Sequence, residues 1–142
     1  YFPNQRLPWY LRAAMAICGA GLVCLLAVAL WLEPSKKGFG THVQLGLNPC
    51  SFTELFGIRC PSCGMTTSWA HTVRGQLVQA VKANSGGTLL ALVSEVVGPW
   101  LVVSAALGRW WFGKPNEWMV VAVAALVVLV TLVDWGYRLS TL

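Results

Sequence analysis

The chain has 142 residues, of which 56% are hydrophobic and only 11% are charged. Soluble globular domains carry about 25% charged residues, so this composition excludes an ordinary soluble domain and is typical of a protein built for lipid. The net charge of +5 does not indicate nucleic-acid binding, because the ten Lys and Arg residues are scattered between apolar blocks. We interpret them as anchors at the membrane surface.

Three apolar segments are long enough to cross a hydrocarbon layer about 30 Å thick at about 1.5 Å of helix rise per residue. They cover residues 11–32, 88–107 and 118–133. The first is longer, at about 20 apolar residues, than the roughly 7 to 15 of a signal peptide, and we interpret it as a permanent anchor. The sequence therefore predicts an all-α, multi-pass protein of the lipid bilayer, with three transmembrane helices in a single membrane domain.

The connector between the first two spans, residues 33–87, is too long for a structureless loop in a compact protein. Its segment SFTELFGI predicts a short helix in which Ser51 and Glu54 form a capping box. A second helix is predicted over PSCGMTTSWAHTVR, with Pro61 in its first turn. The pattern of QLVQAVKA predicts a third helix in the membrane interface. We expect these short helices to pack on the membrane and to be partly re-entrant.

The connector also carries a cluster of metal-ligating residue types. Cys60 and Cys63 form a C-x-x-C, and Cys50 lies ten residues upstream, across the predicted helical hairpin. Zinc takes four ligands from Cys and His, so this trio needs a fourth, for which the sequence offers His42 and His71. His71 would lie about 12 Å beyond Cys63 along one helix, whereas His42 lies in an adaptable loop.

Several interpretations of these cysteines stay open. The first is a structural or sensory site for one zinc-like ion, and the second is a redox-active dithiol of Cys60 and Cys63 that exchanges disulfides with a partner. The third is a structural disulfide or inert packed thiols. No catalytic residue is assigned, because the only aspartate, Asp134, ends the third span and lies far in sequence from either histidine. We favour a metal-binding or thiol-stabilised role over catalysis.

A carboxylate inside the second span also requires a reason. Glu95 would be costly if it were charged and exposed to lipid, so it should face protein, hold a proton or have a partner, such as His71, Arg74 or a second protein. Ser94 and Gly98 beside it form a small-xxx-small step that favours close helix contact. We predict a buried, hydrogen-bonded carboxylic acid at a helix interface. A homo-oligomer or an accessory subunit of a membrane complex stays open.

The run NPCSFTELFGIRCPSCGMTTSWAHTVRG resembles the signature of a bacterial membrane-protein family of unknown function, in which C-P-x-C-G-[LM]-T is followed by R-G and A-N. The matching positions are Cys50, Phe52, Gly57, Cys60, Pro61, Cys63, Gly64, Met65, Thr66, Arg74, Gly75, Ala83 and Asn84. This chain has Thr67 where many relatives have arginine. The resemblance implies a small polytopic protein of a bacterial cell membrane and supplies no activity.

Overall fold

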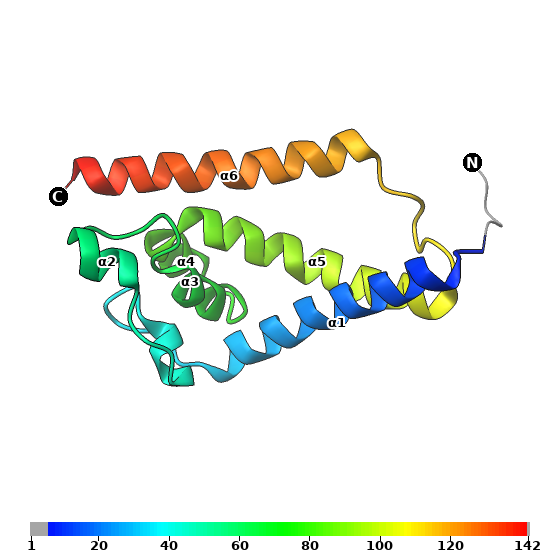
Figure 1. Cartoon of the computed structure of the whole chain (residues 1–142), viewed down its shortest axis with the longest axis horizontal. Helices are drawn as coiled ribbons and strands as arrows, with labels where there is room; N and C mark the ends of the chain where they lie inside the picture. Colours follow the sequence, from blue (N-terminus) through cyan, green and yellow to red (C-terminus); the bar gives the residue numbers. More distant parts are fainter. Residues whose placement is uncertain (1–5, 142) are drawn as a thin grey trace.

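The structure is a computed structural model that describes residues 6–141 of the chain. Within these residues every regular element is a helix, so the predicted all-α fold is confirmed. Three helices are long, and the short ones lie between the first and second of these (Figure 1). The elements in chain order are α1 (Trp9–Trp31), η1 (Thr41–Leu45), α2 (Ser51–Phe56), α3 (Met65–Thr72), α4 (Leu77–Ala83), α5 (Ser85–Leu107) and α6 (Glu117–Ser140).

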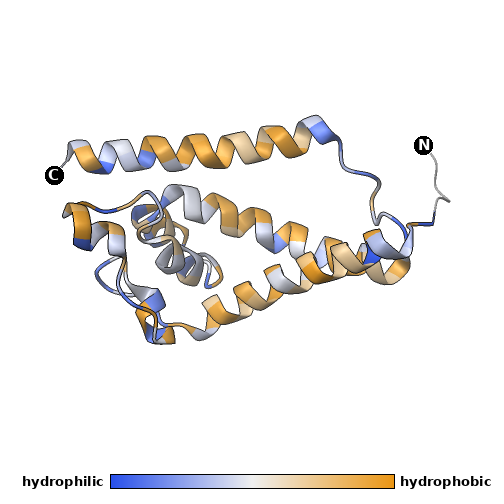
Figure 2. Cartoon of the chain, in the orientation of Figure 1, coloured by the Kyte–Doolittle hydropathy of each residue, from blue (hydrophilic) through white to orange (hydrophobic). Residues whose placement is uncertain are grey.

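The long helices α1, α5 and α6 are each long and apolar enough to cross a membrane, with mean hydropathies of 2.5, 1.9 and 2.4 over their apolar windows. Figure 2 shows the apolar residues running along all three. They correspond to the three predicted spans. Helix α6 continues beyond its predicted end at residue 133 because Asp134 and Arg138, one turn apart, form an ion pair of 2.7 Å.

Helices α1 and α5 pack closely through glycine. A Cβ atom on Gly19 of α1 would lie 2.9 Å from Leu101 Cβ, and one on Gly98 of α5 would lie 3.3 Å from Leu22 Cβ. Ser94 of α5 is buried on the same side of the helix. The small residues therefore bring these two backbones together within one chain, as such residues do in membrane helix pairs.

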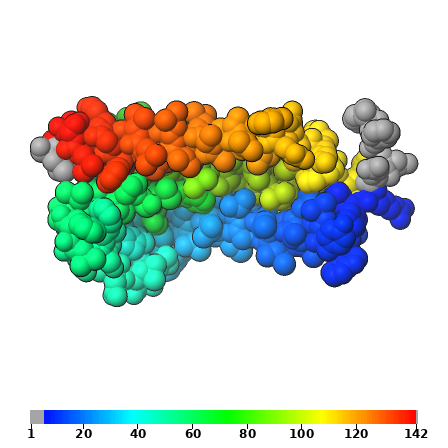
Figure 3. All heavy atoms as spheres, turned by 45° about the horizontal axis from the view of Figure 1, so that its top comes forward, coloured from blue at the N-terminus to red at the C-terminus, as the bar shows by residue number. Residues whose placement is uncertain are grey.

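Helix α6 forms an outer layer over the other helices (Figure 3), and none of its residues is buried. An apolar cleft of about 1330 Å³ separates α6 from α5, with Val97, Trp100 and Val123 among its lining residues. Within the described chain, the hydrogen bonds that join α6 to other elements come from Asp134, Trp135 and Arg138. Helix α6 is therefore fixed at its C-terminal end.

The connector folds against the end of α1 and the start of α5, as predicted for short helices at the membrane (Figure 1). One predicted helix boundary is wrong, because α3 begins at Met65 and the segment from Pro61 to Gly64 is a turn. Gly64 has a φ of +83°, a left-handed conformation that favours glycine and interrupts any helix that would start at Pro61. The C-x-x-C therefore precedes a helix instead of forming its first turn.

Arg74 joins the connector to the end of α1. Its guanidinium donates to the carbonyl oxygens of Ala29, Leu30 and Leu32 at distances of 3.1, 2.6 and 2.7 Å. These carbonyls belong to the last turn of α1 and the residue after it, where helical partners are missing and the dipole is negative. Arg74 therefore satisfies the helix end at the point where the chain turns into the connector.

We expect Arg74→Met to destabilise the protein by about 3 kcal/mol, because several charge-assisted hydrogen bonds are lost and the carbonyls of α1 lose their donor. Unfolding in detergent, followed by the loss of helical circular dichroism, measures this effect. The matched control is Arg109→Met, which removes an exposed arginine whose side chain makes no hydrogen bond with the described residues. Equal stability of the two variants would contradict the capping role of Arg74.

Candidate metal centre

Three cysteine sulfurs come together where the connector meets α6. The Sγ atom of Cys60 lies 3.4 Å from that of Cys50 and 3.2 Å from that of Cys63, and the three sulfurs all lie within 4.8 Å of one another. Cys50 and Cys60 are half-buried and Cys63 is buried. The hydroxyl of Thr53 adds an oxygen 3.6 Å from Cys63 Sγ. Among the described residues, the three cysteines form the group that could hold a metal ion.

These spacings fit coordination better than a covalent bond between sulfurs. Tetrahedral zinc with Zn–S distances of about 2.3 Å separates its sulfurs by about 3.8 Å, and the separations of 3.4 and 3.2 Å in this cluster lie within about 0.6 Å of that value. A disulfide requires about 2.05 Å. All five cysteines of the chain lie in the described part, and all are free. The predicted disulfide is therefore not found, and the trio has the spacing of a metal site.

Cys50 occupies the N-cap position of α2, so the predicted capping box of Ser51 and Glu54 is not formed. The amide of Thr53, followed by the side chain of Cys60, lowers the pKa of Cys50 from 9.0 to about 7. The helix start therefore stabilises a thiolate, because its free amides point at the sulfur.

Cys60 has the opposite shift. Burial, followed by hydrogen bonding with Cys63 and Cys50, raises the pKa of Cys60 from 9.0 to about 12. Adjacent sulfurs at these distances resist ionising together because their negative charges repel in a partly desolvated site. A bound cation would offset that repulsion, since metal ligation requires the deprotonated thiolate.

Asn84 holds the cysteine turn in place from inside the fold. Its side chain is fully buried, and Nδ2 donates to the carbonyl oxygens of Pro61 and Cys63 at 3.0 and 3.2 Å. Its Oδ1 atom accepts the amide of Gly87 at 2.8 Å and so caps the start of α5. One amide group therefore fixes the turn between Cys60 and Cys63 relative to α5.

Gly64 permits this close contact. A Cβ atom at this residue would lie 2.5 Å from the carbonyl oxygen of Ala83 and 2.7 Å from that of Gly38. Any larger residue would therefore push the cysteine turn away from Asn84, in addition to straining the positive φ.

Three residues near the end of α6 hold the same turn from outside the connector. We name these residues, Asp134, Trp135 and Arg138, the α6 clasp. Arg138 donates to the carbonyl oxygen of Cys63 at 3.1 Å, and Trp135 Nε1 donates to that of Arg59 at 2.7 Å. Asp134 orients Arg138 through their ion pair. The sequence analysis did not assign these residues, although an acidic and a basic residue four apart at the end of a span were the available signal.

Two contacts fix the loops around the turn. The guanidinium of Arg59 lies 4.1 Å from the ring centroid of Phe39, a cation–π distance. Thr67 is fully buried and its hydroxyl lies 2.5 Å from that of Thr41. The segment before Cys50 and the helix after Cys63 are thus tied together.

The structure places both histidines outside the sulfur cluster. His42 Nε2 donates to the carbonyl oxygen of Asn48 at 3.2 Å, and His71 Nδ1 donates to Gln76 Oε1 at 2.7 Å. Neither belongs to the group of ligand atoms within 4.8 Å of one another. The assignment of either histidine as the fourth ligand stays a prediction.

Glu95 is the carboxylate that the sequence places inside the second span. It is exposed, and its carboxylate has no hydrogen bond or ion pair with the described residues, so Glu95 is not buried by the described chain itself and its place at a helix interface stays a prediction. The two connector residues considered as partners have other contacts, since His71 binds Gln76 and Arg74 binds the end of α1. The packed face of α5 is instead the one that carries Ser94 and Gly98.

Residues 50–97 match the model of a family described as "Protein of unknown function (DUF2752)". The match covers about a third of the chain. It includes the three cysteines, Asn84 and the first half of α5, and it ends before α6. No curated protein and no solved structure matches the chain. The similarity therefore supports the connector as a unit and supplies no activity.

We expect Asn84→Leu to destabilise the protein by about 3 kcal/mol, since it leaves two carbonyl oxygens and one amide without their buried partner. It should also speed the reaction of Cys63 with an alkylating reagent, because the turn is released. The control is Asn48→Leu at an exposed position of the same connector. Alkylation of Cys63 at the wild-type rate in Asn84→Leu would contradict the positioning role of Asn84.

Proposed function

We propose that this chain is a multi-pass protein of a bacterial cell membrane whose connector binds one zinc-like ion through Cys50, Cys60 and Cys63. The observation that supports this most directly is the approach of three free sulfurs to within 4.8 Å of one another. Cysteine thiolate is a preferred ligand of zinc. The role is structural or sensory, and turnover of a substrate is not part of the proposal.

The surroundings of the sulfurs support a built site. Asn84, at the N-cap of α5, and Arg138, in α6, both donate to the carbonyl oxygen of Cys63, so the backbone of the turn is held in one conformation. Preorganised ligands of this kind favour metal affinity, because less conformational entropy is lost on binding.

We propose His42 as the fourth ligand. It lies in the segment that leads directly to Cys50, and its present partner, Asn48, is two residues from that cysteine. His71 lies in the last turn of α3, about 9 Å of helix rise beyond the start of that helix at Met65. A ligand that must move onto the metal suits a sensory site, since metal binding would then rearrange η1.

Two alternatives remain as proposals. The C-x-x-C sulfurs lie 3.2 Å apart, and Cys50, with its lowered pKa of about 7, is placed 3.4 Å from Cys60. That geometry also suits a membrane thiol–disulfide protein. An accessory subunit or homo-oligomer, in which the cysteines serve only the shape of the connector, is the other alternative.

Elemental analysis of the purified protein in detergent should give about one metal ion per chain. Changing Cys50, Cys60 or Cys63 to Ser should each lower zinc affinity by at least about a hundredfold, because a direct ligand is lost. The matched controls are Cys18→Ser and Cys24→Ser, which replace exposed cysteines of α1 outside the cluster, and these should keep the metal.

The number of free thiols before and after reduction separates the alternatives. If the protein contains no metal and two of its thiols are detected only after reduction, the thiol–disulfide proposal replaces the metal proposal. Absence of metal with all five thiols free would leave the accessory role.

His42→Ala should lower zinc affinity at least about tenfold, whereas His71→Ala should leave it within about twofold, because only His42 lies next to the cysteine segment. Cobalt substituted for zinc reports the change directly, since its absorption depends on the number and kind of its ligands. Identical cobalt spectra for wild type and His42→Ala would show that His42 is not a ligand.

A further inference from the structure

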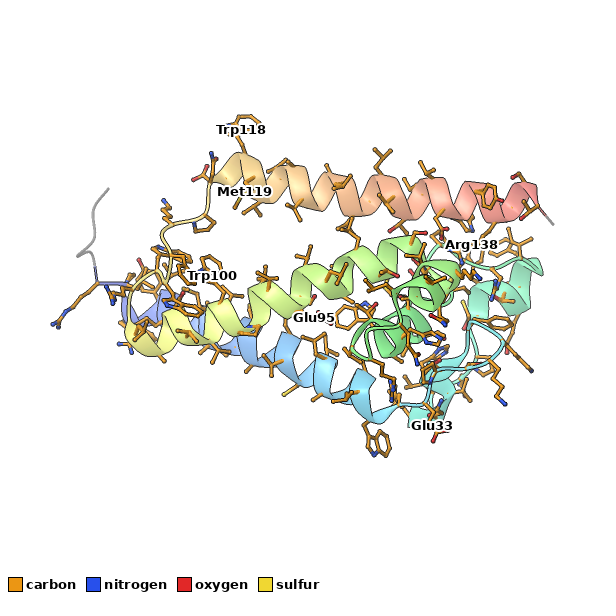
Figure 4. All side chains as sticks on the ribbon, turned by 180° about the vertical axis from the view of Figure 1, so that it is seen from behind. Glu33, Glu95, Trp100, Trp118, Met119 and Arg138 are labelled. Atoms are coloured by element: carbon orange, nitrogen blue, oxygen red, sulfur yellow. The ribbon has the colours of Figure 1, made fainter. Side chains whose placement is uncertain are left out.

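Glu95 is a carboxylate without a partner at the centre of a transmembrane helix. It lies midway along α5, five residues before Trp100, and Figure 4 labels both residues on this helix. Its side chain is exposed and contacts no hydrogen-bond donor among the described residues. Carboxylates at this depth almost always face protein or water and pair with another group. Within residues 6–141 that requirement is not met.

The residues around Glu95 form a stripe with the spacing of a helix-packing seam. Leu92, Glu95, Pro99, Val102 and Ala106 are all exposed and follow one another at alternating intervals of three and four residues. That interval keeps side chains on one face of a helix that packs against another helix. The neighbouring face of α5, with Ser94 and Gly98, is already used by α1, and Leu92 at the end of the stripe also lines the cleft toward α6. We name the exposed residues the Glu95 stripe.

A second copy of the chain does not supply the missing donor. The basic residues of the three long helices are Arg12 and Arg138, which lie near helix ends. Both are engaged, since Arg12 donates to the carbonyl oxygen of Ala105 and Arg138 pairs with Asp134. Two copies joined through the stripe would place one Glu95 against another, and like charges in a medium of low dielectric constant repel strongly.

We propose that the Glu95 stripe binds a transmembrane helix of a different protein that carries a lysine or arginine at the depth of Glu95. The apolar residues of the stripe would pack against that helix, and the basic side chain would donate to the carboxylate. The pairing removes the cost of a lone carboxylate in lipid and gives the contact its specificity. This inference does not depend on metal binding at the cysteines.

The test uses the full chain in phosphatidylcholine vesicles with two synthetic helices as probes, a poly-leucine helix with one central lysine and the same helix with leucine instead. Fluorescence energy transfer between labels on chain and probe measures binding. The lysine helix should bind about tenfold more tightly, the effect of one strong interhelical hydrogen bond. Glu95→Leu should abolish the difference. The matched control Glu117→Leu removes an exposed carboxylate at the start of α6 and should preserve it.

Equal binding of the two probes to the wild-type chain would overturn the proposal. Self-association of the wild-type chain that is lost in Glu95→Leu would also overturn it, because the occupant would then be a second copy in which two carboxyl groups share a proton. Glu95→Gln keeps the size of the side chain and serves as a second variant in case Glu95→Leu does not fold. It should lower the preference for the lysine helix several-fold, since the charge is lost.

Discussion

The buried side chain of Asn84 is the contact on which the arrangement of the connector depends. Its amide binds the cysteine turn at two carbonyl oxygens and caps the first turn of α5 at the same time. A buried amide is costly unless its donors and acceptor are all satisfied, so this position tolerates few other conformations. The requirement for Gly64 follows, because only glycine leaves room for the turn to reach this corner.

The α6 clasp adds a second constraint that comes from a distant part of the sequence. The family similarity ends at residue 97, whereas Asp134 and Arg138 lie more than thirty residues later. The similarity covers the part of the connector that holds the three cysteines and Asn84, and the third long helix closes this part from outside. Because α6 is otherwise separated from α5 by an apolar cleft, the cysteine turn and α6 position each other.

The sequence predicted the elements whose signal is local. Long apolar runs predicted the spans, and the short hairpin between Cys50 and Cys60 predicted that the cysteines would meet. It misplaced the start of α3, because Pro61 suits a first helical turn and the left-handed conformation of Gly64 depends on tertiary contacts. The α6 clasp was missed for the same reason, since only the folded chain brings Arg138 to the cysteine turn.

Helix α5 is the element that the two proposed sites share. At its first turn Asn84 ties it to the cysteine turn, and about 16 Å further along Glu95 has no partner within the described chain. Buried polar atoms near the connector also lack a hydrogen-bond partner among the described residues, such as Arg59 Nε, Trp69 Nε1 and Arg138 Nε, but an unpaired polar group costs most in hydrocarbon. The proposed partner helix would therefore satisfy Glu95 at the depth where an unpaired carboxylate is most costly.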